Sequence, residues 1–130
     1  MTFRRRSLFA LVPALALAAC GGGGGSGGSS ATPTAPANPN LTVIAEEIHY
    51  DQKEYSVPAG EVRVALKNEG AQTHNLIVQD PAGNRIDPKL QDGPGKDTGG
   101  VYQLTPGKYT LYCDITGHRE AGMVASLTVS

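Results

Sequence analysis

KYTLYCDITGHREAGMVASLTV, residues 108–129, is the stretch that decides the fold of this chain. Apolar and polar side chains alternate at both of its ends, in 108–113 and again in 124–129. A period of two is typical of half-buried β-strands. The stretch therefore predicts two neighbouring strands joined by a loop.

The loop between these strands contains residues with metal-binding side chains. In strand register Cys113 lies on the same face as Leu111, so its thiol is expected to point into the core near the end of its strand. A loop as long as 114–123 can fold back and bring His118 and Met123 to the same point. One strand end is thus predicted to offer a thiol, an imidazole and a thioether.

The rest of the chain from residue 41 onward has the same short alternating pattern, with no helical period of any length. Further strands are predicted at 41–50, 61–67, 73–79 and 101–104, separated by turns rich in glycine, proline and asparagine. The stretch 80–100 is rich in Pro, Gly and Asp and is predicted to be a long surface excursion with at most one short helical turn. These features indicate an all-β sandwich or barrel.

The N-terminus has the features of an export signal. Arg4–Arg6 form a basic region, an apolar run follows, and Leu17-Ala18-Ala19-Cys20 resembles the lipobox of bacterial lipoproteins. We therefore predict a lipoprotein signal peptide at 1–19 and acylation of Cys20. The alternative is an ordinary signal peptide that leaves Cys20 as a free thiol.

Composition divides the remainder into a linker, 20–40, and one domain, 41–130. The linker is Gly, Ser, Ala, Thr, Pro and Asn without charge, so it is expected to be a flexible tether. The domain carries eight basic and twelve acidic residues, a formal charge of −4. This acidic balance argues against nucleic acid as a partner and mildly favours a basic protein face.

Acylation of Cys20 would leave Cys113 unpaired in an exported protein, which calls for an explanation. Two imidazoles, a thiolate and a thioether are the ligands of a trigonal copper site with a weak axial methionine, and His74 at the start of a predicted strand supplies the second imidazole. The alternatives are a buried inert thiol, a surface histidine and a methionine that fills the core. His49 has no partner at comparable spacing and is expected to face water.

The motif Tyr-Cys-x4-His-x4-Met at 112–123, with a glycine before the histidine and before the methionine, resembles the copper loop of the cupredoxins. The segments 57–60 and 68–70 and the pair His74-Asn75 follow in the order that this family uses. The loop length is similar to that of rusticyanin-like and auracyanin-like members. The resemblance covers the whole domain and implies a single Greek-key cupredoxin-like β-sandwich.

By this resemblance one copper ion, Cu(I) or Cu(II), is expected to be bound by ring nitrogens of His74 and His118, by the Cys113 thiolate and by Met123 as axial ligand. The backbone N–H of Asn75, which is not itself a ligand, is expected to donate a hydrogen bond to the Cys113 sulfur. The implied function is electron transfer by a blue copper protein, without enzymatic activity. A copper chaperone or storage protein is the alternative.

The same resemblance implies redox protein partners such as a cytochrome or an oxidase. We expect a monomer that reaches the membrane only through its lipid. The predicted location is the periplasmic or cell-surface side of a bacterial membrane.

Overall fold

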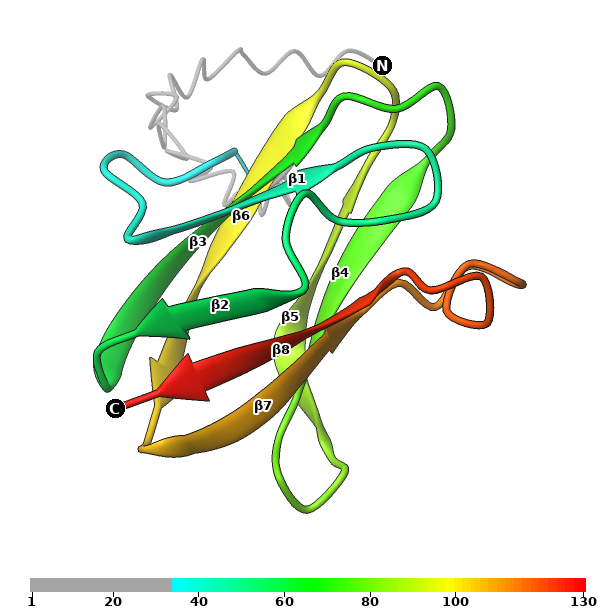
Figure 1. Cartoon of the computed structure of the whole chain (residues 1–130). Coiled ribbons are helices and arrows are strands. Elements are labelled where there is room, and N and C mark those ends of the chain that lie inside the picture. The colour runs from blue at the N-terminus through cyan, green and yellow to red at the C-terminus, as the bar shows by residue number, and fades with distance from the viewer. Residues whose placement is uncertain (1–33) are drawn as a thin grey trace, which may run out of the picture.

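Within residues 34–130, the part of the chain that this computed structural model describes, eight strands form two facing sheets (Figure 1). One sheet has the order β1-β3-β6 and consists of β1 (Leu41–Ala45), β3 (Gly60–Asn68) and β6 (Asp97–Leu104). The other has the order β2-β8-β7-β4-β5 and consists of β2 (Glu54–Val57), β8 (Val124–Val129), β7 (Gly107–Tyr112), β4 (His74–Gln79) and β5 (Arg85–Asp92). The predicted all-β sandwich is confirmed.

The core lies between the two sheets because alternate side chains of each strand face inward. On β3 the predicted inward face of Val62, Val64 and Leu66 is buried. The opposite sheet contributes Leu76, Leu90, Leu111 and Leu127, all fully buried. Each fully buried aliphatic side chain of this kind contributes about 1.5–3 kcal/mol.

The prediction of a surface excursion at 80–100 is wrong. This stretch contains β5 and the first half of β6. It carries few apolar residues, and Pro88 lies within β5. Proline is tolerated there because β5 is the edge strand of its sheet, where a missing N–H need not break a ladder.

Two glycines explain why β6 resembles a loop in the sequence. A Cβ on Gly99 would overlap Pro36 and the carbonyl oxygen of Val64. A Cβ on Gly100 would lie 2.6 Å from Cγ of Pro88 on the facing strand β5. Glycine is therefore required on both faces of this strand by close approach of its neighbours, not by a turn.

Two further predictions on strands need correction. The strand predicted at 41–50 ends at Ala45, and the chain returns to it only through an isolated bridge between Ala45 and Tyr50. Strand β2 has only four residues and was not predicted; it pairs in parallel with β8.

Residues 34–40 belong to the predicted linker, yet they contact the domain. Pro36 lies against Gly99, and Arg63 donates from Nε to the carbonyl oxygen of Asn38 at 2.9 Å. The side chain of Asn40 accepts from the backbone N–H of Arg63 at 2.6 Å. The linker boundary at 40, the signal peptide and Cys20 stay predictions, and residues 1–33 lie outside the described part.

Strands β4 and β7 are antiparallel neighbours, with Ile77 opposite Tyr112. The start of β4 and the end of β7 therefore lie side by side at one end of the sandwich.

From residue 34 onward, the chain forms no helix with the length and apolarity that a bilayer crossing requires.

Candidate metal centre

Cys113 and Met123 lie opposite each other where β7 ends and β8 begins. The backbone N–H of Cys113 donates to the carbonyl oxygen of Met123 at 3.2 Å, which extends the β7–β8 ladder by one residue. Both side chains are fully buried. The strand pair thus presents a thiol and a thioether to the interior from a rigid end.

The loop between them folds back through its own backbone. The N–H of His118 donates to the carbonyl oxygen of Ile115, and the carbonyl oxygen of His118 accepts from the N–H of Met123, each at 2.9 Å. Gly117 has φ +86°, a conformation that favours glycine. This turn places Nδ1 of His118 3.6 Å from Sγ of Cys113. His118 is 7% exposed, which makes it the least enclosed of the four predicted ligands.

His74 is the first residue of β4 and reaches the same end of the sandwich from the neighbouring strand. Its ring is fully buried, and its centroid lies 5.2 Å from that of His118. Neither ring nitrogen of His74 has a hydrogen-bond partner. Burying such groups without partners is costly, so a ligand for them is expected.

Three buried side chains bring their ligating atoms together at this point. One ring nitrogen each of His74 and His118 and the sulfur of Cys113 all lie within 4.8 Å of one another. Burial, aided by the neighbouring His118, lowers the pKa of His74, which favours the neutral imidazole that metals bind. The group therefore fits a borderline or soft metal ion.

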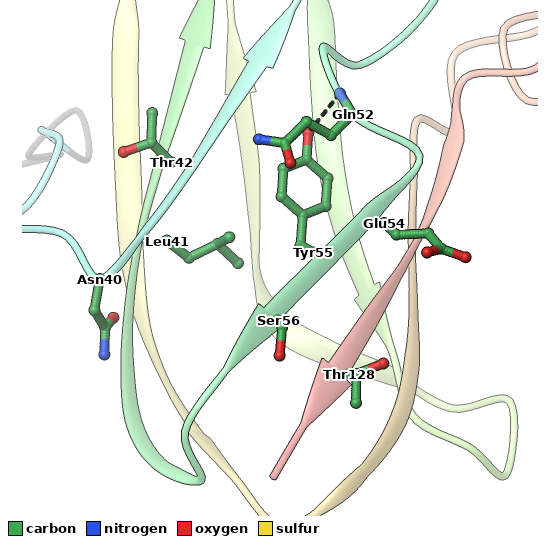
Figure 2. Close-up of a pocket in the computed structure, with 8 residues that line it drawn as sticks. All are labelled: Asn40, Leu41, Thr42, Gln52, Glu54, Tyr55, Ser56 and Thr128. Atoms are coloured by element: carbon green, nitrogen blue, oxygen red, sulfur yellow. Dashed lines mark hydrogen bonds between the residues drawn. The ribbon is translucent and has the colours of Figure 1, made fainter.

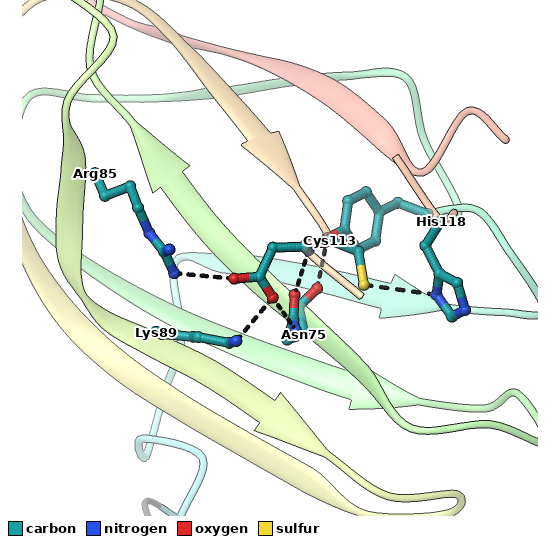
Figure 3. A network of polar contacts seen from close by, with 7 residues as sticks. Asn75, Arg85, Lys89, Cys113 and His118 are labelled. Atoms are coloured by element: carbon teal, nitrogen blue, oxygen red, sulfur yellow. Dashed lines mark hydrogen bonds and ion pairs between the residues drawn. The ribbon is translucent and has the colours of Figure 1, made fainter. Parts of the chain in front are cut away.

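A polar network fixes the two strands that carry His74 and Cys113 (Figure 3). Oδ1 of Asn75 accepts from the backbone N–H of Asp114 at 2.9 Å, and its Nδ2 donates to Oδ1 of Asp114 at 2.7 Å. The buried hydroxyl of Tyr50 donates to the carbonyl oxygen of Asn75 at 2.6 Å. Burial first, and then the negative charge of the Cys113 thiolate, raises the pKa of Tyr50 far above its usual range, so that this hydroxyl remains a donor.

The Asp114 carboxylate extends this network to β5. It accepts from Nζ of Lys89 at 2.7 Å and from Nη2 of Arg85 at 3.2 Å. Partial burial opposes ionisation of Asp114. Hydrogen bonds from Lys89 and Asn75 outweigh it and, with the charges of both cations, hold the pKa of the carboxyl below its usual range.

A family model described as a cupredoxin-like domain matches residues 10–125. The chain belongs to the cupredoxin-like family. In this cupredoxin the two histidines and the cysteine, with the buried Met123 beside them, are consistent with one type 1 copper ion, the site typical of blue copper electron carriers.

Solved structures share the fold of this cupredoxin. A reduced auracyanin from Roseiflexus castenholzii is 26% identical, with a TM-score of 0.63 over 73% of this chain and 99% of its own. Auracyanin A from Chloroflexus aurantiacus, a "blue" copper protein, is 22% identical, with a TM-score of 0.60 over 72% of this chain and 100% of its own. An azurin from Methylomonas sp. strain J is 19% identical, with a TM-score of 0.58 over 68% and 95%. Among curated protein sequences, none matches the chain.

The structure brings three predicted ligands, His74, Cys113 and His118, into one group. Met123 is buried at the end of the same loop. The backbone donation from Asn75 to the Cys113 sulfur stays a prediction, because the hydrogen bonds described for Asn75 outside the β4–β5 ladder are to Asp114 and Tyr50.

Sequence reasoning did not identify Gly70, Tyr50 and Asp114 as parts of this site. A Cβ on Gly70 would lie 2.9 Å from Nε2 of His74, so this glycine gives the ring its space. The sequence offers one signal for Asp114, namely its position directly after Cys113. Its two cationic partners, Arg85 and Lys89, lie in the stretch 80–100, for which the sequence predicts a surface excursion.

Two other features lie apart from this centre. His49 is exposed and pairs through Nε2 with Glu46 at 2.7 Å, in agreement with its expected position facing water. An open hollow between β1 and β2 is lined mostly by polar side chains such as Thr42, Glu54 and Thr128 (Figure 2). It contains none of the metal-ligating group, which is the single one found in residues 34–130.

Proposed function

We propose that this cupredoxin is a mononuclear blue copper electron carrier, held at a bacterial membrane by a lipid on Cys20. The observation that carries the copper part is the buried meeting of ligating atoms from His74, Cys113 and His118 within 4.8 Å. The two unpartnered ring nitrogens of His74 support it, since a metal would satisfy one of them.

In this proposal His74 and His118 would hold the ion through ring nitrogens, Cys113 through its thiolate, and Met123 more weakly through its thioether sulfur. A copper ion held by these residues would supply one-electron chemistry between Cu(II) and Cu(I). Asn75 does not bind the ion; its side chain joins the strands of His74 and Cys113 through hydrogen bonds to Asp114.

The scaffold favours a carrier because its ligands need to move little. His74 and Cys113 are at the ends of adjacent paired strands, and backbone hydrogen bonds close the loop that holds His118 and Met123. An electron can then arrive or leave without large rearrangement of the protein. His118, the least enclosed ligand, is the proposed contact with redox protein partners such as a cytochrome or an oxidase. We propose no catalytic role.

The copper proposal is tested by adding Cu(II) to the purified protein and recording its visible spectrum. We expect an intense blue thiolate-to-copper band that a mild reductant bleaches reversibly. The chain's two cysteines offer a matched pair: Cys113→Ser should abolish the band, and Cys20→Ser should leave it unchanged. A colourless wild-type protein that binds only Cu(I) would contradict the carrier and favour a chaperone or storage role.

Anchoring and the periplasmic or cell-surface location are supported by the sequence around Cys20. In cells given a labelled fatty acid, we expect the label on the wild-type chain and on Cys113→Ser. The label should be absent from Cys20→Ser. Equal labelling of Cys20→Ser would reject the lipid anchor at this residue.

A further inference from the structure

Asp114 connects three neighbouring strands at the proposed copper site. It directly follows Cys113, and its backbone N–H and its carboxylate both bind the side chain of Asn75 on β4. The same carboxylate binds Lys89 and Arg85 on β5 (Figure 3). Because β7, β4 and β5 are adjacent in the sheet, one side chain links all three.

This arrangement differs from an ordinary surface ion pair, which contributes little because it is solvated and flexible. The carboxylate is 28% exposed and receives three donors, two of them cationic. Hydrogen bonds to charged groups are shorter and stronger than neutral ones, and a network restrains its members more than a single pair does.

The geometry points to a positioning role for this carboxylate, and this inference rests on the proposed function. We propose that Lys89 and Arg85 hold Asp114, that Asp114 orients the Asn75 amide, and that Asn75 thereby fixes the separation of His74 and Cys113. Asn75 is suited to this role because it is fully buried and directly follows His74. Its carbonyl oxygen is also held by Tyr50.

The proposal separates two ways in which Lys89 can influence the copper. If Lys89 acts through Asp114, its removal leaves the carboxylate poorly compensated, loosens Asn75 and lowers the reduction potential. If Lys89 acts only as a distant positive charge, its removal lowers the potential whether or not Asp114 is charged. A double-mutant cycle distinguishes these cases.

The experiment compares wild type with Lys89→Met, Asp114→Asn and the double variant, each loaded with Cu(II). Lys108→Met is the matched control, because it removes the same charge from an exposed position on β7. The readouts are the reduction potential and the position and intensity of the visible band.

We expect Lys89→Met to lower the potential and to change the band, and Lys108→Met to change neither. In the Asp114→Asn background, Lys89→Met should add no further change. Equal shifts from Lys89→Met in both backgrounds would overturn the proposal in favour of a distant charge effect. Absence of any change in Lys89→Met would overturn it as well.

A metal-free measurement keeps this test independent of copper loading. In the apoprotein the Asp114 backbone N–H, which donates to Asn75, should exchange with solvent roughly fivefold to tenfold faster in Lys89→Met than in wild type. Unchanged exchange would reject the restraint on Asn75. A wild-type protein that never turns blue would reject the proposed function, whereas a blue wild type with unresponsive variants would reject only this inference.

Discussion

Gly70→Ala is expected to disturb the seat of His74 while adding only one methyl group. A Cβ at this position would lie 2.9 Å from Nε2 of His74, 2.9 Å from the carbonyl oxygen of Glu46 and 3.0 Å from the carbon of that carbonyl. Two of these three atoms are backbone, and the third belongs to a fully buried ring. None of them can move away without disturbing its surroundings.

The magnitude follows from this crowding. Relief requires a displacement of a few tenths of an ångström in a closely packed interior, and overpacking of this kind typically costs about 1–3 kcal/mol. For a domain of this size each kcal/mol lowers Tm by about 4–8 °C. We therefore expect the metal-free variant to unfold roughly 4–24 °C below wild type.

The assay is thermal unfolding of the apoprotein, followed by the visible spectrum after Cu(II) addition. The shifted His74 ring should alter the blue band even at temperatures where the variant is folded. Gly93→Ala is the control, because no atom lies within 4 Å of its Cβ position and its backbone is not in the left-handed region. It should be neutral or slightly stabilising, since alanine restricts the unfolded chain. A Gly70→Ala protein with wild-type Tm and a wild-type spectrum would refute the argument.

Three further predictions concern stability. Tyr50→Phe removes the buried 2.6 Å donation to Asn75 and should lower the free energy of unfolding by about 1–3 kcal/mol in a urea titration; an unchanged midpoint would contradict it. Partial burial of Asp51 opposes its ionisation, but hydrogen bonds, chiefly from Tyr55, outweigh it and lower the carboxyl pKa from 3.8. Its stabilisation is therefore complete above about pH 4 and is lost as pH falls through the lowered value, so the urea midpoints of wild type and Asp51→Asn should converge in acid and differ at neutral pH. Removal of copper with a chelator should lower Tm, because copper binds the folded site; at a free concentration one hundred times Kd the effect is about 2.7 kcal/mol, and identical melting curves would count against specific binding.

The metal centre was the most predictable part of the molecule. Cys113, His118 and Met123 lie within one hairpin loop, so their order and spacing already limit where they can meet, and alternation fixes the face of Cys113. To place His74 at the same point, its strand must lie next to β7. The pairing of Ile77 with Tyr112 shows that it does.

The parts that the sequence did not reveal depend on contacts between distant segments. The strand character of Gly99 and Gly100 arises because Pro36 and Pro88 approach their two faces, and no local pattern records that approach. Gly70 likewise resembles an ordinary turn residue until the His74 ring is placed beside it. The sequence shows that Asp114 follows Cys113. Its partners Lys89 and Arg85 can be identified only once β5 is placed beside β4.

The contact of Pro36 with Gly99 sets the direction from which the chain enters the domain. Residues from 34 up to β1 and the loop that carries His118 lie on opposite sides of the sandwich in Figure 1. The segment from residue 34 therefore joins the domain beside the three-stranded sheet, away from that loop. If the proposed lipid on Cys20 holds the protein, this point of entry leaves the His118 loop uncovered for the proposed redox partner.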